Sequence, residues 1–108
     1  MGFSVLLTDD TSRDLEDIYD CIDLHDGRGK ADHVLDRIEK AFNSLSGNFH
    51  RGVHPRELLC LGLREFREIL FKPYRIIYRV IENNVYVLLI VDGRRDIQKL
   101  LQRRLLQA

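Results

Sequence analysis

Apolar positions divide the chain into a helical first half and a strand-rich second half. Apolar residues at 15, 18, 19 and 22 recur at helical spacing, and a second stripe follows at Ala31, Val34, Leu35, Ile38, Phe42 and Leu45. Between them, Asp26-Gly27-Arg28-Gly29 carries the glycines that typically end helices. The pattern predicts two antiparallel helices joined by a short loop.

A short strand is predicted ahead of these helices. Phe3–Leu7 reads FSVLL, a brief apolar run followed by Thr8, Asp9 and Asp10. Threonine is a good helix N-cap, and carboxylates in the first turn interact favourably with the helix dipole. The first helix is therefore expected to begin just after Thr8.

The second half predicts three strands and a final helix. The strands are expected at Arg64–Phe71, Tyr74–Glu82 and Val85–Val91, with turns at Lys72-Pro73 and Asn83-Asn84. Pro55–Leu63 reads as an irregular packing segment, and Asp96 is a suitable cap for a helix with Ile97, Leu100, Leu101 and Leu105 on one face. The order predicts an α+β fold: an N-terminal strand, a helical hairpin, and a three-stranded antiparallel meander that completes a four-stranded sheet before the last helix.

A two-residue turn at 83–84 fixes a predicted register for the last two strands. One face then carries Ile76, Tyr78 and Val80 against Val91, Leu89 and Val87 and is the expected core face. The other face mixes aliphatic and basic residues: Arg75, Ile77, Arg79 and Ile81 against Asp92, Ile90, Leu88 and Tyr86. Such a face is expected where a partner or the last helix crosses the sheet. This register places Arg75 opposite Asp92.

Composition indicates a soluble, cytoplasmic chain forming a single domain over residues 1–108. Hydrophobic residues make up 44% and charged residues 31% of the sequence. The longest apolar run, 85–91, is too short to span a membrane, and the N-terminus has no signal-peptide pattern. Cys21 and Cys60 are expected to be buried thiols.

The net charge of zero conceals a strong asymmetry. Residues 1–48 contain 11 acidic and 5 basic side chains, whereas residues 49–108 contain 6 acidic and 12 basic ones. Any attraction for nucleic acid must come from the C-terminal half. His50, His54 and Cys60 have loose spacing without a second ligand pair, so no metal and no other cofactor is expected.

The motifs, in their order and at their distances, resemble the RelE/ParE superfamily of bacterial toxins. The resemblance rests on LLTDDTSRDLEDIYDCI, GVHPREL, FREILFKPYRIIYRV and VYVLLIVDGRRD, and it covers essentially the whole chain. It implies the toxin of a type II toxin–antitoxin module with a cognate antitoxin partner. RelE-like members cut messenger RNA on the ribosome, whereas ParE-like members trap DNA gyrase on cleaved DNA.

Carried over by resemblance, the nuclease site is incomplete. Arg67, Arg75 and Arg95 match its basic positions, but Ile69 occupies another basic position, and the proton-transfer residue falls near Leu101. Arginine stabilises a transition state but is a poor proton shuttle. The resemblance therefore favours an inhibitor of DNA gyrase that is not an enzyme; an mRNA endonuclease and a degenerate toxin that only binds antitoxin are the alternatives.

Candidate binding residues follow from the same pattern. The target-binding candidates are Arg75, Asp92, Arg94 and Arg95, and the antitoxin-binding candidates are Ile77, Arg79, Ile81, Tyr86, Leu88 and Ile90. The competing interpretation is that these arginines form an ordinary solvated rim, and that Tyr78 and Tyr86 are packing residues. We expect no membrane association and no specific DNA binding by the toxin alone.

Overall fold

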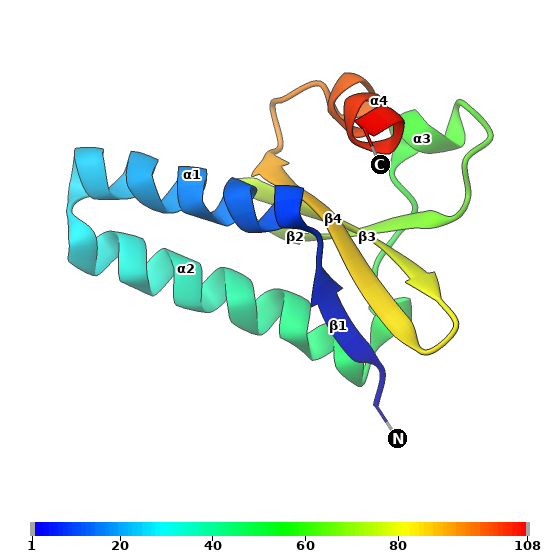
Figure 1. The fold of residues 1–108 in the computed structure, drawn as a ribbon, viewed down its shortest axis with the longest axis horizontal. Helices are drawn as coiled ribbons and strands as arrows, with labels where there is room; N and C mark the ends of the chain where they lie inside the picture. The colour runs from blue at the N-terminus through cyan, green and yellow to red at the C-terminus, as the bar shows by residue number, and fades with distance from the viewer. Residues whose placement is uncertain (1, 108) are drawn as a thin grey trace.

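Helices cover both faces of a four-stranded sheet in the computed structural model, which describes residues 2–107 (Figure 1). The strands are ordered β1-β4-β3-β2, with β1 parallel to β4 and the other neighbours antiparallel. The α1–α2 hairpin packs on one face and α4 on the other. The predicted α+β architecture is confirmed.

The strands and helices follow the predicted order, with one short helix added. Strands are β1 (Ser4–Leu7), β2 (Phe66–Phe71), β3 (Tyr74–Ile81) and β4 (Asn84–Asp92). Helices are α1 (Asp9–Asp26), α2 (Arg28–Asn43), α3 (Arg56–Leu59) and α4 (Ile97–Gln107), with two 3₁₀ turns at Ser44–Ser46 and Phe49–Arg51. The segment expected to be irregular therefore contains α3.

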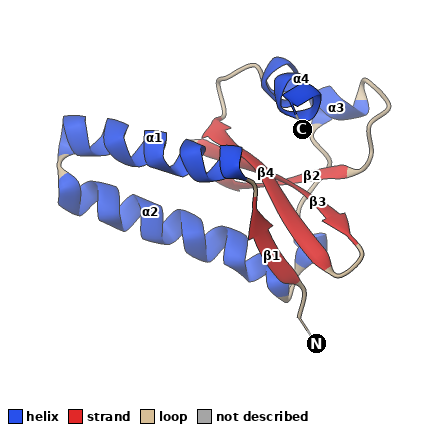
Figure 2. Cartoon of the chain, in the orientation of Figure 1, coloured by secondary structure: helices blue, strands red, loops and turns tan. Residues whose placement is uncertain are grey.

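The helical hairpin begins and turns where the sequence indicates. The Thr8 side chain accepts a hydrogen bond from the Thr11 backbone N–H, which caps α1. Gly27 joins the helices with a φ of 93°, a conformation that L side chains rarely adopt. Figure 2 shows the hairpin extending well beyond the sheet, so the distal half of α1 has no sheet to cover.

The β3–β4 turn lies one residue earlier than predicted. Ile81 pairs with Asn84, and Glu82, rather than an asparagine, adopts the positive φ of 56°. The pairing of β1 explains this position: Ser4 aligns with Asn84 and donates its N–H to the carbonyl of Asn83. A parallel strand from the N-terminus therefore helps to set a turn that local sequence placed elsewhere.

A bulge then reverses the predicted faces in the distal half of β4. Tyr78 pairs with Val87 and Ile77 with Leu89, so Leu88 has no partner across β3. Ile90 consequently enters the core beneath the helical hairpin, whereas Leu89 and Val91 face α4, and these three assignments were wrong. The predicted opposition of Arg75 and Asp92 is also wrong: Arg75 lies opposite Val91, and Tyr74 opposite Asp92.

The sheet thus separates two cores. Beneath the hairpin, the buried set comprises Leu15, Ile38, Phe42, Leu45, Ile69, Ile76, Tyr78, Val85, Val87 and Ile90. Beneath α4, the buried set comprises Leu58, Phe66, Ile77, Leu89, Ile97 and Leu101. The mixed sheet face is therefore covered, in part, by the last helix of the chain itself.

Side chains continue the ladder where β1 ends beside β4. The Val87 carbonyl accepts a hydrogen bond from Thr11 Oγ1 at 2.8 Å, and the Leu88 carbonyl accepts one from Arg104 Nη1 at 2.8 Å. The Asp14 carboxylate accepts the Ile90 N–H at 3.0 Å and also binds the Arg104 guanidinium. These contacts satisfy backbone groups near the bulge and anchor α1 and α4 to the same edge.

Both cysteines are exposed, which corrects the expectation of buried thiols. Cys21 lies on the distal half of α1, and Cys60 follows α3 in a surface turn, so neither position faces a core. Among the described residues, no helix has the length and apolar character needed to cross a membrane.

Candidate functional site

Arg75 is engaged by two glutamates rather than presented to solvent. Its Nη1 and Nη2 atoms each lie 2.7 Å from a different carboxylate oxygen of Glu57, and its Nε lies 2.6 Å from Glu68 Oε1. The arginine side chain is 14% exposed. The arrangement connects α3, β2 and β3 through one guanidinium, a planar group suited to such two-pronged contacts.

The ion cluster changes the protonation of its members. Hydrogen bonding from Arg75 lowers the pKa of Glu57 from 4.5 to about 2, and the hydrogen bonds from both glutamate partners raise the pKa of Arg75. At neutral pH the cluster contains one cation and two carboxylates. It therefore offers a phosphate no free positive charge.

The three arginines matched to a nuclease are held separately. Arg67 Nη1 donates to the Gly52 carbonyl at 2.8 Å, and Arg67 pairs with Tyr78, whose ring lies in the core beneath the helical hairpin. Arg75 turns toward α3 on the other sheet face. Arg95 instead lines a pocket beside α1. The structure does not gather these side chains around one point.

Leu101 occupies the position where the resemblance places a proton-transfer group. Its side chain is 1% exposed and packs with Ile97 and Leu58 in the core beneath α4. A buried leucine can neither bind a substrate hydroxyl nor carry a proton. The tertiary position of this residue thus agrees with its unsuitable chemistry.

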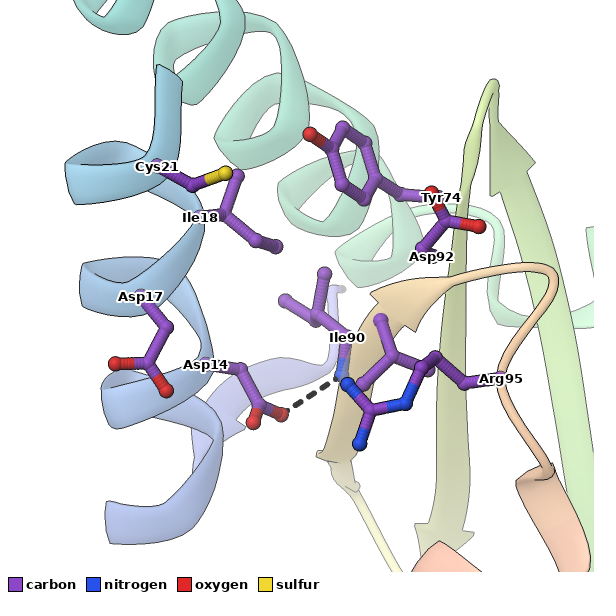
Figure 3. A pocket seen from close by; sticks show the side chains of 9 residues that line it. Asp14, Asp17, Ile18, Cys21, Tyr74, Ile90, Asp92 and Arg95 are labelled. Atoms are coloured by element: carbon purple, nitrogen blue, oxygen red, sulfur yellow. Dashed lines mark hydrogen bonds between the residues drawn. The ribbon is translucent and has the colours of Figure 1, made fainter. Parts of the chain in front are cut away.

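Figure 3 shows the pocket between α1 and the distal end of β4. Its volume is about 260 Å³, with Asp14, Asp17 and Cys21 on α1 facing Tyr74, Asp92 and Arg95. Burial raises the pKa of Tyr74, whereas hydrogen bonds from Arg94 lower the pKa of Asp92. The phenol is thus neutral and the carboxylate ionised at neutral pH.

Arg94 and Arg95 are the exposed members of the predicted target-binding set. Arg94 binds Asp92 through Nε and Nη2, at 3.1 Å each, while remaining 91% exposed. Arg95 donates its backbone N–H to the Asp92 carbonyl, which fixes the turn between β4 and α4. Asp92 therefore orients this turn, and both guanidinium groups are accessible from solvent.

The antitoxin-binding candidates fall into a buried and an accessible group. Ile77 and Ile90 are 0% and 1% exposed, each within a different core, so neither is available to a partner in this structure. Arg79, Ile81, Tyr86 and Leu88 are intermediate or exposed, and Arg79 pairs directly with Tyr86. This accessible group lies toward the β3–β4 turn.

Sequence reasoning missed the acidic partners of the buried arginines. Glu57 and Glu68 hold Arg75, and Asp14 holds Arg104 across 90 positions of sequence. The single useful signal is that Glu68 lies two residues before Leu70, which pairs with Arg75. Nothing local to Asp14 separates it from the other acidic residues of α1.

The fold and the altered site define a small RelE/ParE-type toxin without a recognisable nuclease centre. A family model described as the ParE toxin of the type II toxin–antitoxin system, parDE, matches residues 5–97. The chain belongs to this family. It is 34% identical over 93 residues to Toxin ParE3 of Caulobacter vibrioides, covering 86% of this chain and 89% of that protein.

A solved structure supports the fold independently. A chain of the chromosomal ParDE toxin–antitoxin system from P. aeruginosa superposes with a TM-score of 0.72 at 22% identity. The match covers 83% of this chain and 95% of the other. At this level of identity the comparison establishes shared architecture.

Proposed function

We propose that this ParE-family toxin poisons DNA gyrase in the cytoplasm and is neutralised by a cognate antitoxin. The observation that carries the proposal is the closed ion cluster of Arg75 with Glu57 and Glu68. An RNA-cutting site needs free cations to stabilise the transition-state charge, together with a group that moves protons. A neutralised Arg75 and a buried Leu101 supply neither.

The accessible residues suggest how target and antitoxin are divided over the surface. We assign target contact to Arg94 and Arg95, with Asp92 fixing the turn that presents them. Arg75 becomes a positioning residue that holds α3 against the sheet. Antitoxin contact is assigned to the exposed sheet surface at Arg79, Ile81, Tyr86 and Leu88.

The decisive experiment compares three readouts after induction of the toxin without its antitoxin. We expect growth arrest with filamentation and a DNA-damage response, and purified toxin should inhibit gyrase supercoiling while leaving translation in a lysate intact. Co-expression of the antitoxin should restore growth.

Two other results identify the alternatives. Blocked translation with transcripts cut on the ribosome identifies a nuclease and overturns the gyrase target. Normal growth combined with tight antitoxin binding identifies a degenerate toxin. Alanine substitution of Arg94 and Arg95 serves to test target contact separately.

A further inference from the structure

A groove lined by leucines lies between α3 and α4. Leu58 and Leu101 form its buried floor, each 1% exposed, and Leu63 lines its side. Leu61 and Leu105 stand at its rim, 59% and 47% exposed. The groove has a volume of about 540 Å³, and its other lining residues are Gln98 and Gln102. Apolar surface gathered in this way is a typical feature of protein-binding sites.

Hydrogen bonds fix the α3 wall of the groove. Gly62, with a φ of 79°, donates its N–H to the Leu59 carbonyl, and Leu63 donates to the Leu58 carbonyl. This pair of bonds is the Schellman arrangement, in which the residues corresponding to Leu58 and Leu63 commonly make an apolar contact. The leucines of this wall are thus positioned before any partner arrives.

The two walls are also tied to each other and to the ion cluster. Gln98 Nε2 donates to the Glu57 carbonyl at 2.7 Å, while the Glu57 carboxylate is held by Arg75. The chain of contacts runs from β3 through α3 to α4. A preformed groove binds with less loss of conformational entropy than one that must be assembled.

The segments that form the groove are positively charged. Arg56, Arg64, Lys99 and Arg103 are exposed and have no ion-pair partner among the described residues. The glutamate of α3, Glu57, is neutralised by Arg75, which leaves Glu65 as the exposed carboxylate of these segments. An apolar partner segment with acidic flanks is complementary to this surface. A second copy of the chain would instead bring cations against cations.

We propose that the leucine groove docks an amphipathic helix of the cognate antitoxin, with apolar side chains in the groove and carboxylates over the basic flanks. Apolar anchors spaced by three or four residues lie on one helix face and suit a groove between two helices. The inference rests on the antitoxin pairing in the proposed function and is independent of the gyrase target. It adds a second contact region to the exposed sheet surface.

The test measures binding of the full-length antitoxin that neutralises this toxin, by titration calorimetry at fixed ionic strength. Leu61→Asp and Leu105→Asp should each weaken binding by about 10- to 100-fold, as expected for central apolar anchors. Leu24→Asp is the matched control, because Leu24 is 83% exposed near the end of α1. This control should leave the dissociation constant unchanged, and thermal melting should report an intact fold for all three variants.

A charge test separates groove docking from a general apolar contact. Arg64→Glu combined with Arg103→Glu should weaken binding and reduce its dependence on salt. Equal affinities for Leu61→Asp, Leu105→Asp and Leu24→Asp would overturn the proposal. So would a self-associating toxin that Leu61→Asp makes monomeric without changing antitoxin affinity. Weakened antitoxin binding alongside unaffected gyrase activity would uphold the groove and refute only the proposed target.

Discussion

Glu57 and Arg75 form a two-pronged ion pair between α3 and β3, with both nitrogen–oxygen distances at 2.7 Å. Glu68 occupies the remaining Nε position at 2.6 Å, so the whole guanidinium edge is engaged. In this ParE-family toxin the arginine matched to a phosphate-binding position therefore connects structural elements. Its position also determines where α3 and the leucine groove lie.

Removing the arginine should destabilise the fold. Arg75→Met leaves two carboxylates facing each other, and we expect a loss of about 2 kcal/mol in the free energy of unfolding, less than for fully buried pairs because Glu57 is partly exposed. Urea denaturation measures this loss. Adding Glu57→Gln and Glu68→Gln to the variant should recover part of the stability. A variant as stable as the parent would show that the cluster is energetically neutral.

The same ion pair predicts a loss of stability in acid. The pKa of Glu57 falls from 4.5 to about 2 on folding, so the unfolded chain binds the proton more readily. The contribution of Glu57 to stability is therefore complete above about pH 5.5 and is lost as the pH falls toward 2. Denaturation midpoints measured across this range should decline less steeply in Glu57→Gln. Identical slopes in the two proteins would contradict the assignment.

Gly52 should not tolerate a side chain. A Cβ at this position would overlap the Tyr78 hydroxyl, which accepts the Gly52 N–H at 3.0 Å and donates to the Phe49 carbonyl at 2.7 Å. We expect Gly52→Ala to lower the free energy of unfolding by about 1–3 kcal/mol through overpacking. Gly47→Ala is the matched control, because a Cβ there meets no atom within 4 Å. Equal melting temperatures for both variants would refute the steric argument.

The Asp14–Arg104 pair should hold α4 in place. Asp14→Ala leaves the Ile90 N–H without its partner and Arg104 without its carboxylate, at a cost of about 3 kcal/mol. Hydrogen exchange should show protection lost first in α4. Arg13→Met is the control, because its exposed pair with Asp10 contributes only about 0–1 kcal/mol. Uniform loss of protection across the chain would argue against a local role in anchoring α4.

Substitution of Arg94 and Arg95 should separate toxicity from stability. Both side chains are exposed and lie outside the two cores, so the double alanine variant should keep the parental melting temperature and antitoxin affinity. If they contact the target, inhibition of gyrase should weaken by about 10-fold or more, as for accessible arginine hot spots. Retained inhibition at parental concentrations would move the target surface elsewhere.

The elements that the sequence predicted well are those with local signals. Thr8 and Asp96 cap their helices as expected, and Gly27 turns the hairpin through a conformation that favours glycine. The stripe from Ala31 to Leu45 faces the core because helical spacing alone selects one side. The β2–β3 register also follows from the sequence, with Phe66 opposite Arg79 and Leu70 opposite Arg75.

The β3–β4 register depends on distant residues and could not be predicted in the same way. The β1 strand helps to position the turn through Ser4, while Asp14 and Arg104 bond backbone groups beside the bulge at Leu88. One extra residue in a strand reverses every side chain beyond it, so the error propagated to Leu89, Ile90 and Val91. For this reason the pairing of Arg75 and Asp92 was wrong although both strands were correctly placed.

By itself, the sequence determined the order of elements, the helix ends and the family resemblance, because these depend on spacing and on residues close in the chain. Tertiary structure alone decided which charges are free. Arg75 and Arg104 are neutralised by carboxylates far away in sequence, whereas Arg94 and Arg95 remain open to solvent. Charge is a property of the residue, but its availability depends on the neighbours that folding brings within hydrogen-bonding distance.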